Sequence, residues 1–329
     1  LIVRLGALGD IVHALPVAAA ARRAWPEAHI DWLVARKHRE ILGLVPVIDE
    51  VVTLENGGGV LSTIRELRRR RYDIAIDLQG LIKSAVLARA SGARRVVGFA
   101  APYLREKPAR LFYGEGCEPA GNGHIVAKNL SILDPLGIRA SAQDPSFPLR
   151  DVESPAAREV ASTAAGPYVV INPGAAWPNK RWPAERFGAV AAWVRERMGF
   201  ASVVTWGPGE EALAAAVVAA SGGAAFVAPP TRVTDLVSLL RGARLMVSGD
   251  TGPTHIAAAV GTPVVGLYGP TRPARNGPWD PADVTVSRDE VCRCHHLRRC
   301  RQPRMCLLDI QVAEVADAVA RRLAGVVRG

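Results

Sequence analysis

The sequence alternates short apolar runs with helix-like segments, and this alternation occurs twice along the chain. The apolar runs are typical of strands covered on both faces, and the intervening segments space apolar residues three and four apart, as amphipathic helices do. Repeated strand–helix alternation favours parallel sheets with helices on both faces. We therefore predict an α/β protein with two Rossmann-like parallel-sheet domains, at residues 1–150 and 151–329. A chain of 329 residues is long for one core and sufficient for two.

The first half is predicted to contain five strands and five helical segments. The predicted strands are Leu1–Leu5, His29–Ala35, Glu50–Leu54, Tyr72–Leu78 and Arg94–Gly98. The first predicted helix ends near Arg23, with a kink or restart at Pro16. The other four predicted helices are Arg36–Leu44, Leu61–Arg71, Ile82–Ser91 and Ile125–Leu136. Residues 100–124 are rich in Pro, Gly and charge, so we expect an irregular excursion or lid there. Residues 137–165 are expected to include a linker near residue 150.

The second half repeats the alternation. Its predicted strands are Tyr168–Asn172, Ala201–Trp206, Ala225–Ala228, Leu245–Ser248 and Val264–Tyr268. Its predicted helices are Trp182–Met198, Glu210–Ser221, Val233–Arg241, Thr254–Val260 and Asp309–Ala324, the last with Asp309 as its N-cap. Ligands of parallel sheets bind beyond the carboxyl ends of the strands, and the cleft between two domains is the expected site.

One junction in the first half carries a carboxylate. Residues 6–10 have the sequence GALGD, and they link the first strand to the first helix. The two glycines permit a tight turn and the close approach of a ligand, but the third glycine of a dinucleotide fingerprint is replaced by Val12. Asp10 stands at a helix N-terminus, where it serves either as a cap or as a general base at the mouth of the cleft.

Two junctions in the second half suit an anionic ligand. Lys180 and Arg181 lie in the loop after the first strand, and two adjacent cations favour a phosphate-bearing molecule or form a solvated basic loop. Residues 248–255, SGDTGPTH, place hydroxyls, backbone N–H groups and His255 at a helix start, which is a favourable place for an anion. Asp250 is unusual beside phosphate, and we expect it to hold the loop through Asx-type bonds to the backbone.

A third junction carries two acids. Glu210 and Glu211 follow the strand that ends at Trp206. A carboxylate here is suited to ribose hydroxyls, and it is equally suited to the first turn of a helix.

Charge and composition limit the partners. The net charge is +10 and the pI is near 9.9, so anionic partners are favoured, although a generally Arg-rich surface explains the charge equally well. Aromatic residues are scarce among the basic runs, which argues against nucleic acid. The sequence shows neither a signal peptide nor an uncharged apolar run long enough to span a bilayer. We expect a cytoplasmic protein that contacts a membrane only at its periphery.

Four cysteines cluster late in the chain, beside His295 and His296. They are Cys292, Cys294, Cys300 and Cys306. Their spacing lacks the usual CxxC pairs of zinc sites, which favours a disulfide or packed thiols over a metal, and a reducing compartment argues against stable disulfides. We therefore predict no metal site and no cofactor.

Four motifs together resemble bacterial glycosyltransferase family 9, the lipopolysaccharide heptosyltransferases. The motifs, in chain order, are LGALGDIVHALP at 5–16, DLQGLIKS at 77–84, KRWP at 180–183 and GDTGPTH at 249–255. The resemblance covers nearly the whole chain. Residues 105–113, REKPARLFY, look most like the branch that loads heptose onto Kdo, whereas the cysteine-rich segment resembles other branches.

The resemblance implies a GT-B fold and an inverting, metal-independent transfer from ADP-heptose to an anionic lipopolysaccharide acceptor such as Kdo-lipid A. It implies catalytic roles for Asp10 as base and Lys180 on the diphosphate. The donor-binding residues that it implies are Glu211 (or Glu210 in its place), Asp250, Thr251, Gly252 and His255. The acceptor-binding residues that we expect on the N-terminal half are Gly9, Lys83 and Arg105, with Lys107 beside them.

Two other functions compete with this one. A nicotinamide-dependent oxidoreductase is consistent with two Rossmann-like halves, although the glycine fingerprint is incomplete. A nonenzymatic nucleotide-sugar-binding protein would bind ADP tightly without turning over any ADP-sugar.

Overall fold

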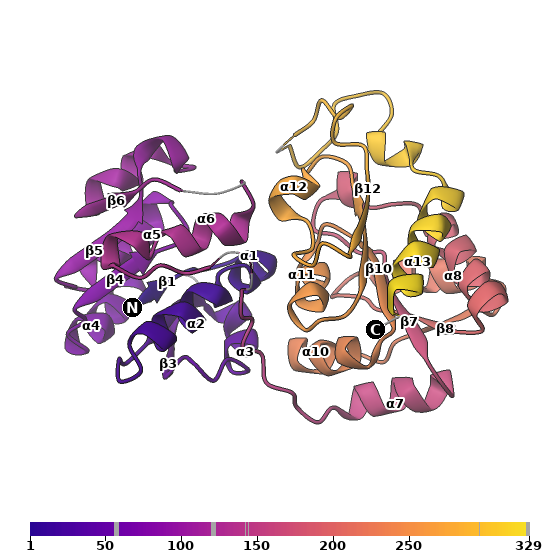
Figure 1. Cartoon of the computed structure of the whole chain (residues 1–329), viewed down its shortest axis with the longest axis horizontal. Helices are drawn as coiled ribbons and strands as arrows, with labels where there is room; N and C mark the ends of the chain where they lie inside the picture. The colour runs from indigo at the N-terminus through magenta and orange to yellow at the C-terminus, as the bar shows by residue number, and fades with distance from the viewer. Residues whose placement is uncertain (56–58, 120–122, 142, 144, 296, 327–329) are drawn as a thin grey trace. The chain divides into compact units, whose positions relative to one another are not determined.

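Two separate parallel sheets organise the chain. The computed structural model describes residues 1–55, 59–119, 123–141, 143, 145–295 and 297–326. Backbone contacts divide it into unit 1, Leu1–Arg150, and unit 2, Asp151–Gly329. Each unit contains one six-stranded sheet in which every neighbouring pair of strands is parallel (Figure 1). The predicted α/β class with two parallel sheets is therefore confirmed.

Unit 1 follows the predicted alternation closely. Its strands are β1 (Ile2–Val3), β2 (Asp31–Ala35), β3 (Glu50–Leu54), β4 (Ile74–Asp77), β5 (Arg95–Phe99) and β6 (Glu115–Cys117). Its helices are α1 (Leu8–Val12), α2 (Leu15–Ala24), α3 (Arg39–Leu42), α4 (Val60–Arg69), α5 (Ile82–Ala90) and α6 (Ile125–Ser131). Its 3₁₀ turns are η1 (Arg36–His38), η2 (Ala101–Tyr103), η3 (Lys107–Phe112) and η4 (Asp134–Leu136). The predicted restart near Pro16 is the break between α1 and α2.

Unit 2 has the same kind of architecture. Its strands are β7 (Tyr168–Asn172), β8 (Ala201–Val204), β9 (Ala225–Val227), β10 (Leu245–Gly249), β11 (Val264–Tyr268) and β12 (Val284–Ser287). Its helices are α7 (Pro155–Ala164), α8 (Ala184–Met198), α9 (Glu211–Ala220), α10 (Val233–Gly242), α11 (Gly252–Ala259), α12 (Pro273–Asn276) and α13 (Val312–Val326). Two 3₁₀ turns complete it, η5 (Pro178–Lys180) and η6 (Cys306–Asp309).

The strand order reverses once in each sheet. Unit 1 has the order β3-β2-β1-β4-β5-β6, and unit 2 has β12-β11-β10-β7-β8-β9. The reversal lies between β1 and β4 in unit 1 and between β7 and β10 in unit 2. The connections that follow the two strands of each pair therefore run toward opposite sides of the sheet. Ligands of open α/β sheets bind in the crevice at the carboxyl ends of such strands. The 6–10 and 77–84 segments follow β1 and β4, and the 172–181 and 249–255 segments follow β7 and β10.

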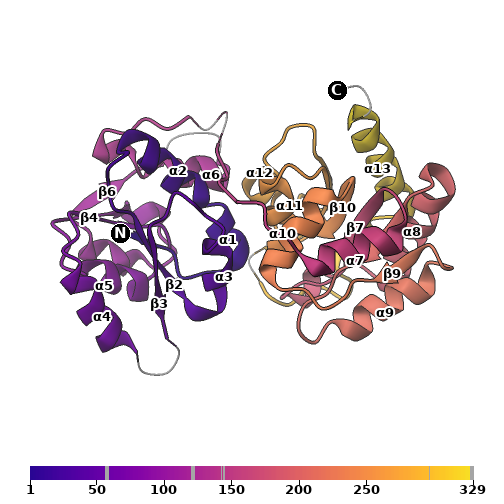
Figure 2. The same cartoon turned by 90° about the horizontal axis from the view of Figure 1, so that it is seen from below.

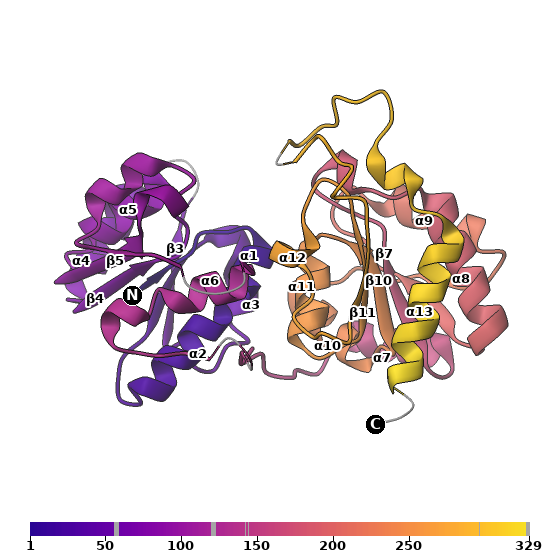
Figure 3. The ribbon, with the colours of Figure 1, turned by 45° about the horizontal axis from the view of Figure 1, so that its top comes forward.

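Helices cover both faces of each sheet, as parallel strands require. In unit 1, α4 and α5 lie on one face, and α2 and α6 pack together on the other (Figure 2). In unit 2, α8, α9 and α13 cover one face, and α7, α10 and α11 cover the other (Figure 3). Trp182 is 2% exposed and meets Phe187 edge-to-face with 5.0 Å between the ring centroids. No helix in the described part of the chain combines the length and apolarity needed to cross a bilayer.

A buried carboxylate fixes the turn after β4. The Asp77 side chain is fully buried and accepts hydrogen bonds from Tyr113 Oη at 2.7 Å, Ser84 Oγ at 2.8 Å and the Gln79 amide at 2.8 Å. Burial raises the pKa of Asp77 even though these donors favour its ionised form. The Leu5 amide donates to Gln79 Oε1 at 2.7 Å, so the turns that follow β1 and β4 are tied together.

Several elements were not predicted, among them the short helix α12. The 100–124 segment is not wholly irregular, because it contains η2, η3 and strand β6, whose three residues are too few and too polar to show an apolar run. Strand β12 was likewise missed. The 137–165 segment includes α7, which begins where Ser154 Oγ accepts from the Ala157 amide at 3.1 Å and Pro155 occupies the first turn.

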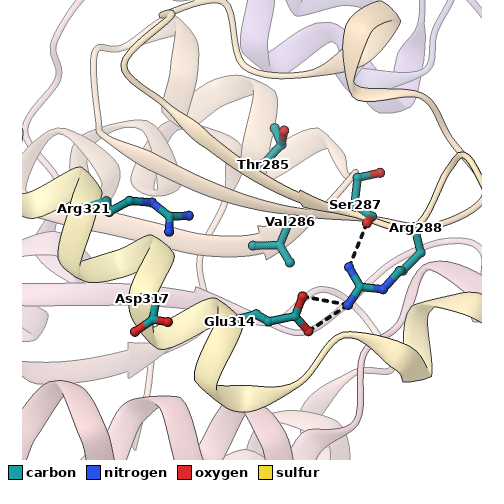
Figure 4. A pocket seen from close by; sticks show the side chains of 7 residues that line it. All are labelled: Thr285, Val286, Ser287, Arg288, Glu314, Asp317 and Arg321. Atoms are coloured by element: carbon teal, nitrogen blue, oxygen red, sulfur yellow. Dashed lines mark hydrogen bonds and ion pairs between the residues drawn. The ribbon is translucent and has the colours of Figure 1, made fainter.

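The start of the terminal helix was also predicted wrongly. Asp309 is not the N-cap of α13, because it ends η6 and the helix begins at Val312. The backbone amide that precedes the helix, that of Gln311, donates a hydrogen bond to the Glu314 carboxylate at 2.8 Å instead. Arg288 holds the same carboxylate with two 2.7 Å hydrogen bonds at the edge of a pocket of about 310 Å³ between β12 and α13 (Figure 4). This pocket contains none of the predicted site residues.

Replacing Tyr113 by Phe tests the buried Asp77 network. The substitution removes one donor from a buried carboxylate, so we expect the free energy of unfolding to fall by about 1–3 kcal/mol. Denaturant titration of the two proteins measures this difference. Tyr103→Phe is the matched control, because the Tyr103 side chain is exposed, and it should leave stability nearly unchanged. Equal stability of the Tyr113 variant and the wild type would contradict the assigned role of the network.

Candidate active site

A buried ion pair lies where β7 and β10 end. Lys180 Nζ donates to Asp250 Oδ2 at 2.6 Å, and the two side chains are 15% and 4% exposed. His255 Nε2 lies 3.1 Å from the other carboxylate oxygen, Oδ1, and this histidine is also buried. Burial alone would raise the pKa of Asp250, but the hydrogen bond from His255 and the charge of Lys180 hold it well below its ordinary value. The carboxylate is therefore ionised and fixes both partners.

This arrangement corrects one expectation. Asp250 was expected to bond to the backbone of its own loop, but its two oxygens take Lys180 and His255 instead. Lys180 comes from the loop after β7, and His255 comes from the first turns of α11. One carboxylate thus joins two segments that are 70 and more residues apart in sequence.

Polar side chains around Asn172 shape the same edge of the sheet. Asn172 ends β7 and is 4% exposed. Its Nδ2 donates to Gly174 O at 3.1 Å and to Ser248 Oγ at 3.2 Å, and its Oδ1 accepts from Thr205 Oγ1 at 3.2 Å. The sequence had not singled out Asn172, although a polar residue at the end of an apolar strand was a visible signal.

The turn after β10 is closely packed against the Lys180 loop. A Cβ at Gly249 would lie 2.9 Å from Lys180 O, so only glycine allows this approach. Thr251 caps α11 in an extended conformation and exchanges a 3.3 Å hydrogen bond with Thr254, which donates to Gly249 O. Lys180 also lies 4.6 Å from the centre of the Trp177 ring, a cation–π contact that fixes the ammonium further.

The two adjacent acids are placed differently. Glu210 Oε2 accepts from the Gly207 amide at 3.1 Å, and Oε1 lies 3.4 Å from Arg181. A Cβ at Gly174 would lie only 2.0 Å from Glu210 Oε2, so this carboxylate reaches the loop after β7. Glu211 begins α9 and is exposed. The structure therefore brings Glu210, the alternative of the two, to Arg181 and to the loop after β7 that also carries Lys180.

Unit 1 places Asp10 at the end of β1. The residue lies in the first turn of α1, where its Oδ2 accepts from the Ala7 amide at 3.1 Å, so it does cap the helix. The same oxygen pairs with Arg4 at 2.7 Å, and the Asp10 side chain remains 42% exposed. Arg4 is 11% exposed and also donates to Leu78 O. A charge inside an apolar strand was the sequence signal for Arg4, and it had been overlooked.

His38 is a second residue that sequence reasoning missed. It ends η1 and is half-buried. A Cβ at Gly6 would lie 2.8 Å from the His38 ring, so the GALGD turn requires glycine at its first position. Burial and the neighbouring Lys37 lower the pKa of His38, and the charge of Asp10 opposes this.

Two of the three predicted acceptor residues, Lys83 and Arg105, lie on neighbouring segments of unit 1. Gly9 is buried within α1. Lys83 is exposed in the first turn of α5, and Arg105 is exposed between η2 and η3. The two segments are joined, because the Ile82 amide donates to Glu106 Oε2 at 2.7 Å.

Comparison with known proteins shows which family this architecture belongs to. The family model of glycosyltransferase family 9 (heptosyltransferase) matches residues 60–305. Lipopolysaccharide heptosyltransferase 1 of Pseudomonas aeruginosa is 32% identical over 89% of this chain and 84% of its own. Lipopolysaccharide heptosyltransferase 3 of Escherichia coli K12 is 32% identical, over 82% of each chain.

The chain belongs to glycosyltransferase family 9. Among solved structures, E. coli heptosyltransferase WaaC with ADP is similar with a TM-score of 0.80 and 24% identity, and the match covers 98% of each chain. The family 9 glycosyltransferase from Veillonella parvula has a TM-score of 0.83 at 24% identity and covers 98% of this chain and 96% of its own. The predicted GT-B fold is thereby confirmed, and the alternative of a nicotinamide-dependent dehydrogenase is set aside.

The cysteines of this glycosyltransferase are free thiols. Cys294 and Cys300 bring their sulfur atoms to 3.2 Å, and burial raises the pKa of Cys306 to about 12. Both ring nitrogens of His295 face backbone oxygens, Pro270 O at 3.2 Å and Asp289 O at 3.0 Å, and His296 lies outside the described residues. Within the residues that the structure describes, no group of three or more His, Cys, Asp or Glu is arranged to hold a metal. The thiols are packed rather than bridged.

Removing the central carboxylate of this glycosyltransferase should destabilise unit 2. Asp250→Asn leaves the Lys180 ammonium, whose side chain is only 15% exposed, without its counter-charge, so we expect a loss of at most about 3–5 kcal/mol at pH 7. Because the pKa of Asp250 is depressed in the folded state, its stabilisation is present above the ordinary value of 3.8 and declines as pH falls below it. Denaturant titrations between pH 7 and pH 3 should therefore show the wild-type advantage shrinking with acid.

The control for this prediction is Asp317→Asn. Asp317 is exposed on α13, so its substitution should leave the free energy of unfolding nearly unchanged at every pH. An Asp250→Asn protein as stable as the wild type at pH 7 would show that the ion pair does not hold the two loops.

Proposed function

We propose that this glycosyltransferase moves a heptose, or a related sugar, from an ADP-sugar to an anionic lipopolysaccharide core acceptor such as Kdo-lipid A. The observation that carries the proposal is the buried Lys180–Asp250–His255 group at the strand-order reversal of unit 2. A fixed ammonium beside a helix N-terminus suits the diphosphate of a nucleotide sugar. The relatives named as lipopolysaccharide heptosyltransferases support the choice of sugar and acceptor, and a similar structure was solved with ADP.

The proposed reaction is a single displacement with inversion. Asp10 accepts the proton of the acceptor hydroxyl, and the oxygen attacks the anomeric carbon of the donor sugar. The bond from that carbon to the diphosphate oxygen breaks, and the diphosphate leaves with the electron pair. By analogy with inverting glycoside hydrolysis, the transition state has cationic sugar character. The half-exposed carboxylate of Asp10, at the end of β1, supports its choice as the base.

Lys180 is proposed to stabilise the departing diphosphate. An ammonium has three donors, so Lys180 can keep its Asp250 contact while it directs another proton to a phosphate oxygen. Thr251 and Gly252 begin α11, whose N-terminal dipole favours the same anion. Fixed donors aimed at developing charge typically lower a barrier by about 2–4 kcal/mol each.

The same residues support a metal-independent mechanism. The sequence contains no Asp-x-Asp motif, which is the usual metal-binding signature of the other major glycosyltransferase fold. A cation is already fixed at the site where a metal would otherwise neutralise the leaving group, since Lys180 is paired there with a buried carboxylate. Asp250 is engaged by both Lys180 and His255.

On the acceptor side, we propose that Lys83 and Arg105 meet carboxylates or phosphates of the acceptor and that Gly9 lets it approach the Asp10 turn. Unit 1 would thus be the acceptor domain and unit 2 the donor domain. An acceptor anchored by acyl chains implies a cytoplasmic enzyme working at the periphery of an anionic inner membrane. The proposal includes no cofactor and no nucleic acid.

One incubation tests this function directly. The protein is mixed with Kdo-lipid A and, in separate reactions, with ADP-heptose, UDP-sugars or GDP-sugars, and the release of nucleotide is followed. We expect release only from the ADP-sugar and only with the acceptor present. Tight ADP binding without turnover of any donor would instead support a nonenzymatic nucleotide-sugar-binding protein.

Asp10→Asn tests the base. The amide keeps the shape of the side chain but cannot take a proton, so we expect kcat to fall by about 10²–10⁴-fold while the Kd for ADP stays unchanged. Steady-state kinetics and calorimetric ADP titration measure the two effects. Asp73→Asn, at an exposed site of the same unit, is the control and should retain full activity. Turnover of the Asp10 variant close to that of the wild type would remove the base assignment.

The adjacent acids provide a matched pair for the donor site. We expect Glu210→Gln to weaken ADP binding by about tenfold, since a ribose hydroxyl bound to a carboxylate loses a charged acceptor of about 1.5 kcal/mol or more. Glu211→Gln should change the Kd little, because Glu211 is exposed at the start of α9. The opposite ranking would assign the ribose contact to Glu211, the residue that the family resemblance implies.

A further inference from the structure

Large apolar side chains are exposed mainly on unit 1. Of the seven that the described residues expose, five belong to this unit. They will be called the apolar rim, and they are Val60, Leu61, Ile82, Tyr103 and Leu111. Leu111 is 84% exposed and Leu61 is 68% exposed. Single exposed apolar residues are common on soluble proteins, but several on one part of one unit indicate a binding surface.

The apolar rim lies on elements of unit 1 that contact one another. Val60 and Leu61 begin α4 after β3, Ile82 begins α5 after β4, and Tyr103 lies in η2 after β5. Since these strands are parallel, these four residues lie near the carboxyl edge of the sheet, as Asp10 does after β1. Leu111 lies in η3, on the stretch of chain that returns from β5 to the start of β6. Helix α4 packs on α5, and both α5 and η2 pack on η3.

The exposed positions are held in place by buried neighbours. Leu104 is buried, and its side chain would lie 2.9 Å from a Cβ at Gly80. Lys128 Nζ donates to Tyr103 O at 2.8 Å, and this bond fixes the backbone that presents the Tyr103 ring. Ala109 is fully buried, which leaves Leu111, two residues later, to point away from the unit. The exposure therefore belongs to a well-anchored segment.

Cations accompany the apolar rim. Lys83 follows Ile82 in α5, Arg105 and Lys107 lie between Tyr103 and Leu111, and all three are exposed. The acid among them, Glu106, accepts from the Ile82 amide at 2.7 Å. Apolar side chains interspersed with cations are suited to an anionic lipid surface, where the apolar groups enter between head groups and the cations meet lipid phosphates.

We propose that the apolar rim is the surface by which this protein docks on an anionic lipid bilayer. The choice of a bilayer as the partner rests on charge complementarity and, for the lipid-anchored acceptor, on the proposed function. Docking through this edge would present the sugar of a membrane-embedded acceptor to the edge that carries Asp10. A second copy of the chain is the competing occupant, but it would bring like charges of Lys83, Arg105 and Lys107 together.

The test is co-sedimentation with vesicles of phosphatidylethanolamine, phosphatidylglycerol and cardiolipin, without acceptor. Leu61→Ser combined with Leu111→Ser should reduce the bound fraction at least about tenfold, since two inserting side chains are lost. Val227→Ser combined with Val291→Ser is the matched control, because those exposed valines lie on unit 2, and it should bind as the wild type does. Binding of the wild type should also fall as salt is raised.

Two further measurements separate the outcomes. Both double variants should bind ADP as the wild type does, which shows that they are folded, and both should remain monodisperse at the wild-type mass. In transfer assays, the rim variant should lose activity on acceptor in vesicles but keep it on a deacylated, water-soluble acceptor. If the wild type transfers sugar to neither acceptor but binds vesicles through the rim, the proposed function fails and the docking surface stands.

Two results would overturn the docking proposal. One is vesicle binding by the rim variant equal to that of the wild type. The other is a change of oligomeric mass in the rim variant, which would assign the rim to contact between copies of the chain.

Discussion

The site depends on parallel strand pairing around a reversal of strand order. In unit 2, β7 and β10 are neighbours whose register pairs Asn172 with Ser248, so the segments that follow both strands begin at the same level and then diverge. A parallel sheet leaves the backbone groups beyond its strands unpaired by the ladder, and here side chains satisfy them: Asn172 bonds to Gly174, Ser248 bonds back to Asn172, and Thr254 bonds to Gly249. The edge is therefore ordered by the protein's own residues.

At that ordered edge, the ion pair with Asp250 offsets the cost of removing the Lys180 ammonium from water. A buried ammonium is costly unless it is paired and hydrogen-bonded, and the pair is also costly if either partner is free to move. Asp250 is fixed by His255, and Lys180 is fixed by Asp250 and by the Trp177 ring. The resulting cation is preorganised: a charge that would have to be ordered during binding or catalysis is ordered by folding instead.

Much of this could be predicted from the sequence, for a physical reason. Buried parallel strands are continuous apolar runs, and the turns that follow them are rich in Gly, Asp and Thr, so the junctions at 6–10 and 249–255 were visible without coordinates. Strand β6 was not visible in the sequence, since its three residues show no apolar run and form a strand through backbone pairing with β5. The direction in which a side chain points could not be predicted from the sequence either. Spacing could not decide between Glu210 and Glu211, because the Gly207 amide determines where the first carboxylate points.

The two central aspartates differ in environment in a way that supports different roles. Asp250 is 4% exposed and has a partner on each oxygen, Lys180 on one and His255 on the other, so protonating it would break its ion pair with Lys180. Asp10 is 42% exposed and shares one oxygen between Arg4 and the Ala7 amide, so its carboxylate can be reached from solvent without unfolding its surroundings. A general base must accept and then release a proton in every turnover, whereas a positioning carboxylate must do neither. Similar residues at comparable strand-to-helix junctions are thus suited to opposite tasks, and burial and partners, rather than residue type, make the difference.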